Sequence, residues 1–304
     1  MSSQCRGGSL LTILFLIPIA STYAQASRPP SDRPTPATKT GDEPSVEVTH
    51  EGEQDGWRVA ETANFCLFHR HARTFAEAVL RTAEQTRIVQ IRKWFGEVGE
   101  NWNPKCRIYL YASGEAYGEA TGAPVHPGGG HTDIQAEDGR VLSRRLHIHG
   151  ARNFLVKGVV PHEVTHAVLA GRLSRERVPR WADEGMAILA EAQPQIEVHF
   201  RQLPRWRADR ALFGTRGLIE MRDYPEPRAL GVFYAQSVSL VDFLTRQKGA
   251  KRFADFVRDG ERDGYAASLR KHYDWSFAEL DRRWRLHAFY NYKVSDTTTT
   301  SGGG

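Results

Sequence analysis

The sequence has little of three things: long apolar runs, cysteine and excess charge. Its N-terminal apolar run, Leu10 to Ala20, covers about eleven residues, too few to span a bilayer, which takes about 20. Three cysteines occur in 304 residues, and Cys5 precedes the apolar run, which disfavours a lipoprotein anchor at a cleavage-site cysteine. The net charge is only +5. So mild and evenly spread an excess argues against nucleic acid as a partner.

The first 26 residues are expected to be a cleavable signal peptide. Arg6 gives a positive start, the apolar run follows, and Ala24-Gln25-Ala26 is a small-x-small cleavage site. We expect a secreted or periplasmic protein that begins at Ser27 and has no stable membrane insertion after the signal is removed. An uncleaved membrane anchor is the alternative. Cleavage would remove Arg6 and no acidic residue, leaving a net charge of +4.

The rest of the chain has an ordinary globular composition, with 40% hydrophobic and 25% charged residues. Residues 27–56 are rich in Pro, Thr, Ser and Asp, so they cannot bury enough surface to offset their ordering entropy and are expected to be a flexible linker. The tail, 294–304, is expected to be disordered. We expect one folded domain over 57–293.

The first part of that domain, about 57–171, is expected to be mixed α/β. Residues 64–68 and 105–111 have strand patterns, and 74–95 has the pattern of an amphipathic helix. Such a strand-helix-strand unit lays its strands parallel, and they can be adjacent. Since an exported chain meets an oxidising compartment, Cys66 and Cys106 are predicted to form an intrachain disulfide. Two buried thiols are the alternative.

The stretch before the central motif contains several histidines. Residues 124–131 include Pro-Gly-Gly-Gly and are expected to be a loop, whereas 141–149 alternate as in a strand. The favoured interpretation is that these histidines lie on the surface, and an approach to a metal is the alternative. They are His126, His131, His147 and His149.

The second part, about 172–293, is expected to be helical. Beyond the segment near Arg180, Gly and Pro separate the helical patterns. The expected helices are 194–210, 231–248, 251–259, 264–273 and 276–292. This order of elements favours an α+β protein with a mixed half, a helical half and a cleft between them.

The central motif is His162-Glu163-Val164-Thr165-His166. Residues four apart lie nearly above one another on a helix, so His162 and His166 would present two imidazoles on one face. Imidazole nitrogens suit zinc, and a catalytic zinc site usually has three protein ligands. Glu163 is placed to take a proton from an attacking water and pass it to a leaving amine. A helix with two solvated histidines and an acid is the alternative.

Pro161, which precedes this motif, either opens the helix or kinks a longer helix that starts near Asn153. Glu184 is the best candidate for the third ligand, because the intervening residues allow the first helix to end and a second to return. That second helix is expected to start near Arg180 and run through Leu189, with Trp181 packing at its start.

His-Glu-Val-Thr-His at 162–166 and Trp-Ala-Asp-Glu-Gly-Met-Ala at 181–187 resemble the gluzincin clan of zinc metallopeptidases. The resemblance is to the peptidase MA-like group of secreted bacterial domains. It implies a zincin-like fold over about 57–290, Zn²⁺ bound by His162, His166 and Glu184, and Glu163 as the catalytic acid/base. It also implies that the strand before the zinc helix, 141–149, is an edge strand that pairs with an extended peptide.

Two departures from the clan limit what carries over. Thermolysin-like members have an Asp four residues after the ligand Glu that holds the first His, and here that position is Ile188. The Gly-x-Met-Glu-Asn element of the large aminopeptidases is absent from the sequence. Asp183 is either a residue that orients a ligand or a solvated acid at a helix start. Tyr234, which opens a helix similar to a downstream helix of the group, is the candidate that stabilises the oxyanion, and a core tyrosine is the alternative.

The expected function is therefore that of a secreted zinc metallopeptidase acting on a peptide or protein substrate. A zinc-stabilised extracellular binding module without catalysis is one alternative, and a zinc hydrolase of a non-peptide amide is another. The sequence leaves the oligomeric state open.

Overall fold

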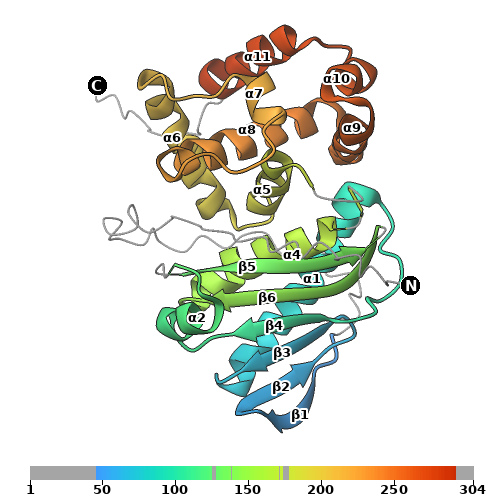
Figure 1. The fold of residues 1–304 in the computed structure, drawn as a ribbon, viewed down its shortest axis with the longest axis vertical. Coiled ribbons are helices and arrows are strands. Elements are labelled where there is room, and N and C mark those ends of the chain that lie inside the picture. Colours follow the sequence, from blue (N-terminus) through green and yellow to red (C-terminus); the bar gives the residue numbers. More distant parts are fainter. Residues whose placement is uncertain (1–45, 125–127, 138, 171, 174–177, 292–304) are drawn as a thin grey trace, which may run out of the picture. The chain divides into compact units, whose positions relative to one another are not determined.

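The computed structural model describes residues 46–124, 128–137, 139–170, 172, 173 and 178–291 (Figure 1). Two compact units divide between Val178 and Pro179, and Ala190–Ala192 belongs to the first unit. The first unit carries the strands, and the second is helical. The expected α+β class is confirmed. The predicted signal peptide, residues 27–45 of the predicted linker, residues 292 and 293 of the predicted domain and the predicted tail, 294–304, lie outside the described residues.

A six-stranded mixed sheet forms the first unit, in the order β1-β2-β3-β4-β6-β5. Strands β3, β4 and β6 are parallel neighbours, and the remaining pairs are antiparallel. The strands are β1 (Thr49–Gln54), β2 (Trp57–Glu61), β3 (Phe65–His69), β4 (Cys106–Leu110), β5 (Gly129–Glu137) and β6 (Arg140–His149).

Strand β1 lies within the segment 27–56 that was expected to be a flexible linker, so that boundary is wrong. Its sequence, Thr-His-Glu-Gly-Glu-Gln, is largely exposed and has no hydrophobic alternation. Backbone pairing with β2 forms the strand, and a strand made mainly by backbone hydrogen bonds has no side-chain pattern for sequence analysis to detect.

Helix α1 (Arg73–Phe95) connects β3 to β4, as predicted for the strand-helix-strand unit, and the two strands are adjacent and parallel. Together with α4 (Val160–Leu169), it packs on one face of the sheet (Figure 1). The hydrophobic core between them includes Val79, Ala83 and Ile91 of α1, Leu67, Ile108, Leu146 and Ile148 of the strands, and Val160, Val164 and Ala167 of α4.

The predicted disulfide is wrong, because both cysteines are thiols. In the parallel pairing, Phe65 is opposite Cys106 and Cys66 is opposite Arg107. The two cysteines are therefore one register position apart and point to opposite faces of the sheet. Adjacency of the strands was predicted correctly, but the register that decides the bond was not.

Strand β5 is at the edge of the sheet, whereas β6 lies between β4 and β5. The expectation that 141–149 is an edge strand is thus wrong, since β5 continues the sheet beyond it. Gly129 and Gly130 belong to β5 and not to a loop. A Cβ at Gly130 would lie 2.7 Å from the His147 carbonyl oxygen and 3.3 Å from Glu163 Cγ, so this glycine serves a close approach and not a turn.

The helix that carries the central motif starts well before Pro161. A turn of α-helix, α3 (Arg152–Phe154), leads into a π-helical segment (Leu155–Val159), and α4 follows. The Val160 amide donates to the Leu155 carbonyl, one residue further than in an α-helix. Of the two predicted alternatives, the longer helical run is therefore observed, with a π turn before the proline.

In the second unit, α8 (Leu230–Lys248) is buried along most of its length. The other helices are α5 (Arg180–Ile188), α6 (Gln193–Ala208), α7 (Thr215–Ile219), α9 (Ala250–Asp263), α10 (Tyr265–Tyr273) and α11 (Phe277–Leu286), with a 3₁₀ turn at Pro227–Ala229 and a π turn at His287–Asn291. The expected helices correspond to α5, α6, α8, α9, α10 and α11. The short helices α7 and α2 (Gly114–Thr121) were not predicted.

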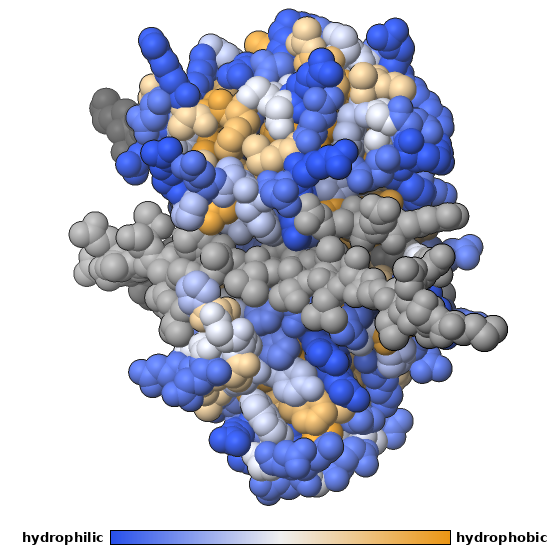
Figure 2. Space-filling model, viewed as in Figure 1, coloured by the Kyte–Doolittle hydropathy of each residue, from blue (hydrophilic) through white to orange (hydrophobic). Residues whose placement is uncertain are grey.

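The visible surface of each unit is mainly hydrophilic, with apolar residues in small groups (Figure 2). Exposed large hydrophobic side chains among the described residues are Val89, Leu142, Leu286 and Tyr290. Within the same residues, no helix combines the length and the apolar character needed to cross a membrane.

Candidate active site

Helix α4 places His162 and His166 one turn apart on a shared face. Their ring centroids are 4.9 Å apart and the ring planes are nearly perpendicular, at 72°. The two residues are 2% and 3% exposed, so the alternative of two solvated histidines is wrong. Two buried imidazoles on one helical turn form a paired nitrogen donor set suited to zinc.

A carboxylate holds the first of these rings. His162 Nδ1 lies 2.8 Å from Glu191 Oε1, and both side chains are buried. When Nδ1–H donates to this carboxylate, the Nε2 lone pair is left for a metal. Glu191 follows the end of α5, and its backbone neighbour Ala192 donates to the Lys157 carbonyl in the π-helical segment.

Sequence analysis missed Glu191. The acid of thermolysin-like members is replaced by Ile188 here, and the signal for a substitute is another carboxylate three residues further along the chain. Helical periodicity could not find it, because α5 ends at Ile188 and Glu191 is beyond the helix.

Glu163 is fully buried beside the histidine pair. Its Oε2 lies 2.7 Å from the hydroxyl of Thr132 on β5, and that hydroxyl is also 3.1 Å from the Glu163 carbonyl oxygen. Within the described part of the chain, Oε1 has no hydrogen-bond partner. Burial raises the pKa of the Glu163 carboxyl, as is typical of a carboxyl that exchanges protons near neutral pH.

In the second unit, Glu184 is a buried residue of α5. It accepts a hydrogen bond from the Tyr224 hydroxyl, and burial followed by the Glu184 charge raises the pKa of Tyr224. The Arg180 guanidinium is 4.8 Å from the centre of the Tyr224 ring. Tyr224 was not predicted, since it lies outside any helix or strand and its sequence surroundings have no periodicity.

Asp183 is not a solvated acid. It is 3% exposed, and it lies 4.0 Å from Arg180 on the same helix. This pair forms at the first turn of α5, where the positive end of the helix dipole also favours an acid.

The remaining residues of the Trp-x-x-Glu-Gly element anchor α5. Trp181 packs against Phe253 with their ring centroids 5.8 Å apart, as predicted for a packing residue at the helix start. A Cβ at Gly185 would lie 2.4 Å from Val241 Cγ2 and 2.8 Å from the Ser237 carbonyl oxygen. Glycine therefore lets α5 lie directly against α8, which fixes the position of Glu184 within this unit.

Tyr234 is buried near the start of α8, with its ring 5.6 Å from that of Phe233. The Tyr224 ring contacts the same Phe233 ring, with centroids 5.7 Å apart. These contacts place Tyr234 near the residue that binds Glu184, and its part in the chemistry stays a prediction.

The histidines expected on the surface are largely buried. His131 is 3% and His149 is 2% exposed, so the surface interpretation is wrong for both, while His126 lies outside the described residues. Burial lowers the pKa of His147 to about 4. The pairing of β5 with β6 brings these histidines close together, because His131 is opposite His147 and Gly129 is opposite His149.

No protein-family model matches the chain, and no curated protein matches it. Among solved structures, the chain is similar to a crystal structure of a mutant M1 zinc metallopeptidase from Deinococcus radiodurans, with 11% sequence identity and a TM-score of 0.40. The match covers 79% of this chain and 51% of that chain. This chain thus spans about half the length of the protein it matches.

Proposed function

We propose that this chain is an exported zinc-dependent metallopeptidase that hydrolyses peptide bonds. In this proposal His162, His166 and Glu184 bind the zinc, and Glu163 is the general base and acid. The observation that carries it is the turn of α4 with two buried imidazoles beside the buried Glu163 carboxyl.

The side chains fit zinc in type and in their support. Two imidazole nitrogens and one carboxylate are a common ligand set of catalytic zinc. His162 has the hydrogen-bonded carboxylate that usually orients a ligating ring, and the Tyr224 hydroxyl orients Glu184. The ligands come from both units, so their meeting at one ion is part of the proposal.

Chain connectivity favours that meeting. The chain from Glu184 to Glu191 runs four residues along α5 to Ile188 and then three residues beyond the helix. Their Cα atoms are therefore at most about 16 Å apart. Because Glu191 is hydrogen bonded to His162, this short tether limits how far Glu184 can be from the histidine pair.

The chemistry assigned to the chain is proton transfer. When bound, zinc would polarise the scissile carbonyl and make a water acidic enough to lose a proton near neutral pH. Thr132 holds Glu163 Oε2, which leaves Oε1 to accept that proton. The same carboxyl then donates the proton to the leaving amine.

Two further residues complete the proposal. Tyr234 stabilises the oxyanion, and its replacement by Phe is expected to lower kcat by about 10²–10³-fold, the usual effect of losing one such donor. Strand β5, as the edge of the sheet, takes the role that was expected of 141–149 and pairs with an extended peptide.

The deciding experiment is digestion of a peptide mixture by the exported protein, with a chelator and after zinc is restored. Cleavage that stops with the chelator and returns with zinc supports the proposal. Glu163→Gln should keep its zinc and lose turnover. Glu197→Gln, a partly exposed acid on α6 that pairs with Arg201, should behave as wild type. Zinc-loaded protein that cleaves no peptide would favour the binding module or a non-peptide amide as substrate.

Export is tested separately. The segment with Arg6, the apolar run and Ala24-Gln25-Ala26 supports cleavage after residue 26. Protein recovered outside the cytoplasm should begin at Ser27 on N-terminal sequencing. Recovery of the intact N-terminus in the membrane fraction would show an uncleaved anchor.

A further inference from the structure

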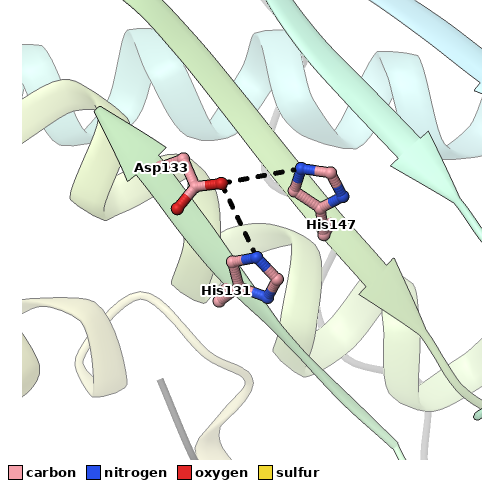
Figure 3. A group of neighbouring side chains, drawn as sticks. All are labelled: His131, Asp133 and His147. Carbon is pink, nitrogen blue, oxygen red and sulfur yellow. Dashed lines mark ion pairs between the residues drawn. The ribbon is translucent and has the colours of Figure 1, made fainter. Parts of the chain in front are cut away.

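A second group of donor atoms lies on the β5–β6 hairpin. His131 and Asp133 are two residues apart on β5, and His147 is opposite His131 on β6. All three side chains are on one face of the hairpin, with one Asp133 oxygen between the two rings (Figure 3). Since Thr132 contacts Glu163, its neighbours in β5 point to the face away from α4.

The distances in this group suit a shared cation better than a hydrogen bond. Asp133 Oδ2 lies 3.7 Å from His131 Nε2 and 3.7 Å from His147 Nε2. These separations exceed the range of an N–H···O hydrogen bond. Ligand atoms about 2.1 Å from a tetrahedral ion are roughly 3.4 Å from one another, so the two histidine–aspartate separations are within a few tenths of an ångström of those at a metal site.

Tyrosine hydroxyls engage the other nitrogen of each ring. The Tyr117 hydroxyl is 2.7 Å from His131 Nδ1, and the Tyr111 hydroxyl is 2.9 Å from His147 Nδ1. When each Nδ1–H donates to its phenolic oxygen, the Nε2 atom of each ring carries the free lone pair, and each Nε2 is 3.7 Å from Asp133 Oδ2. In that tautomer, three electron-rich atoms lie within 4.8 Å of one another, an arrangement that a cation would stabilise.

Stacking fixes the planes of the rings. His131 stacks on His147 with ring centroids 4.8 Å apart at 10°, and Tyr109 stacks on the other side of His147 at 4.9 Å and 13°. Phe68 stacks in turn on Tyr109. The row crosses four strands, so the sheet fixes where the two imidazoles lie, and the rings would turn out of the stack to bind one ion.

Asp133 has a carboxylate oxygen without a hydrogen-bond partner in the described part of the chain, and its side chain is partly exposed to solvent. Its Oδ1 is buried and has no hydrogen-bond partner among the described residues. The Asp133 side chain is 26% exposed, against 4% for His131 and 16% for His147. The partly exposed Asp133 side chain opens the group to solvent, and the three donor atoms lie within 4.8 Å of one another.

We propose that His131 Nε2, Asp133 Oδ2 and His147 Nε2 bind a divalent transition-metal ion, with zinc as the first choice for two imidazoles and a carboxylate. The ion ties the edge strand β5 to β6. Thr132, between two of the ligands, donates to Glu163, so the ion also holds the strand that positions this carboxyl. The site does not depend on the proposed peptidase activity.

Metal analysis of His162→Ala/His166→Ala protein, equilibrated with zinc and desalted, tests this site in isolation. One equivalent of zinc should remain. Adding Asp133→Asn, a change of nearly equal size, should remove it, whereas adding Glu137→Gln, an exposed acid on the same strand, should not. Equal zinc content in the Asp133→Asn and Glu137→Gln proteins, each with an unchanged circular dichroism spectrum, would overturn the proposal.

Tyr117→Phe gives a second test that does not remove a ligand. It should weaken zinc binding at the hairpin by about 10–100-fold, the usual effect of losing a group that orients a ligand, measured by competition with a chromophoric chelator. Cobalt bound in the same background should give visible absorption that Asp133→Asn abolishes. Zinc affinity unchanged by Tyr117→Phe, with no cobalt absorption, would mean that the group is a stacked ring row and not a metal site.

Discussion

The first unit brings histidines beside a carboxyl group in two places, by different means. On α4, His162 and His166 are neighbours because they are four residues apart on one helix. On the hairpin, His131 and His147 are distant in sequence and meet only because β5 and β6 pair in one register. In both places a polar group is hydrogen bonded to Nδ1 of a histidine ring. The group is the Glu191 carboxylate for the helix pair and a tyrosine hydroxyl for each ring on the hairpin.

This difference explains why the site on α4 can be predicted from the sequence and the group on the hairpin cannot. Helical spacing is fixed by the geometry of the helix, so a pair at i and i+4 can be recognised directly. Strand register is set by the whole sheet, and a slip of one residue turns every side chain to the other face. The same limit explains the error at Cys66 and Cys106, where adjacent strands were predicted and the faces were not.

The largest effect is expected at the helix-borne pair. His166→Ala should lower peptide cleavage by at least about 10³-fold, because loss of a ligand removes a contribution of several kcal/mol from the metal. Cleavage rates at saturating zinc check this, with Glu137→Gln as the control. A His166→Ala enzyme within tenfold of wild type would show that α4 does not carry the chemistry.

Glu191→Gln should have the next largest effect. Loss of the charged partner of His162 Nδ1 is expected to weaken zinc binding at α4 by about 10–100-fold and to leave zinc on the hairpin unchanged. Competition with a chelator in an Asp133→Asn background isolates the α4 affinity, and Glu197→Gln is the matched control. Equal affinities in the two variants would mean that Glu191 does not orient the ligand.

Gly130→Ala tests the close packing of β5 against both β6 and α4. Its Cβ would press on the His147 carbonyl oxygen and on Glu163, so the free energy of unfolding should fall by about 1–3 kcal/mol. Gly129→Ala is the matched control, since a Cβ there meets nothing within 4 Å. Urea unfolding curves that coincide for the two variants would contradict the close approach of β5 to α4.

The cysteines should give the smallest effect. Denatured protein beginning at Ser27 should take up two equivalents of iodoacetamide without prior reduction, and reductant should not shift its Tm. Native Cys66 should react slowly at pH 7, because burial and a hydrogen bond with Glu61 raise its pKa to about 12. Alkylation that occurs only after reduction would show that Cys66 and Cys106 are joined by a disulfide.

Sequence patterns predict the helices of the second unit except α7, the strand-helix-strand unit and the histidine pair, all of which depend on local spacing. They missed β1, which has no hydrophobic alternation, and Glu191 and Tyr224, which lie outside any helix or strand. They also misplace the edge of the sheet, because Pro-Gly-Gly-Gly predicts a loop where β5 begins. In the structure these glycines are strand residues, and Gly130 allows a close approach to α4.

The most direct test of the central claim is a crystal of the zinc-loaded protein measured at the zinc absorption edge. The account predicts an anomalous peak about 2.0–2.2 Å from Nε2 of His162, Nε2 of His166 and a carboxylate oxygen of Glu184. Absence of that peak, or a peak at the histidines with Glu184 far from it, would contradict the claim.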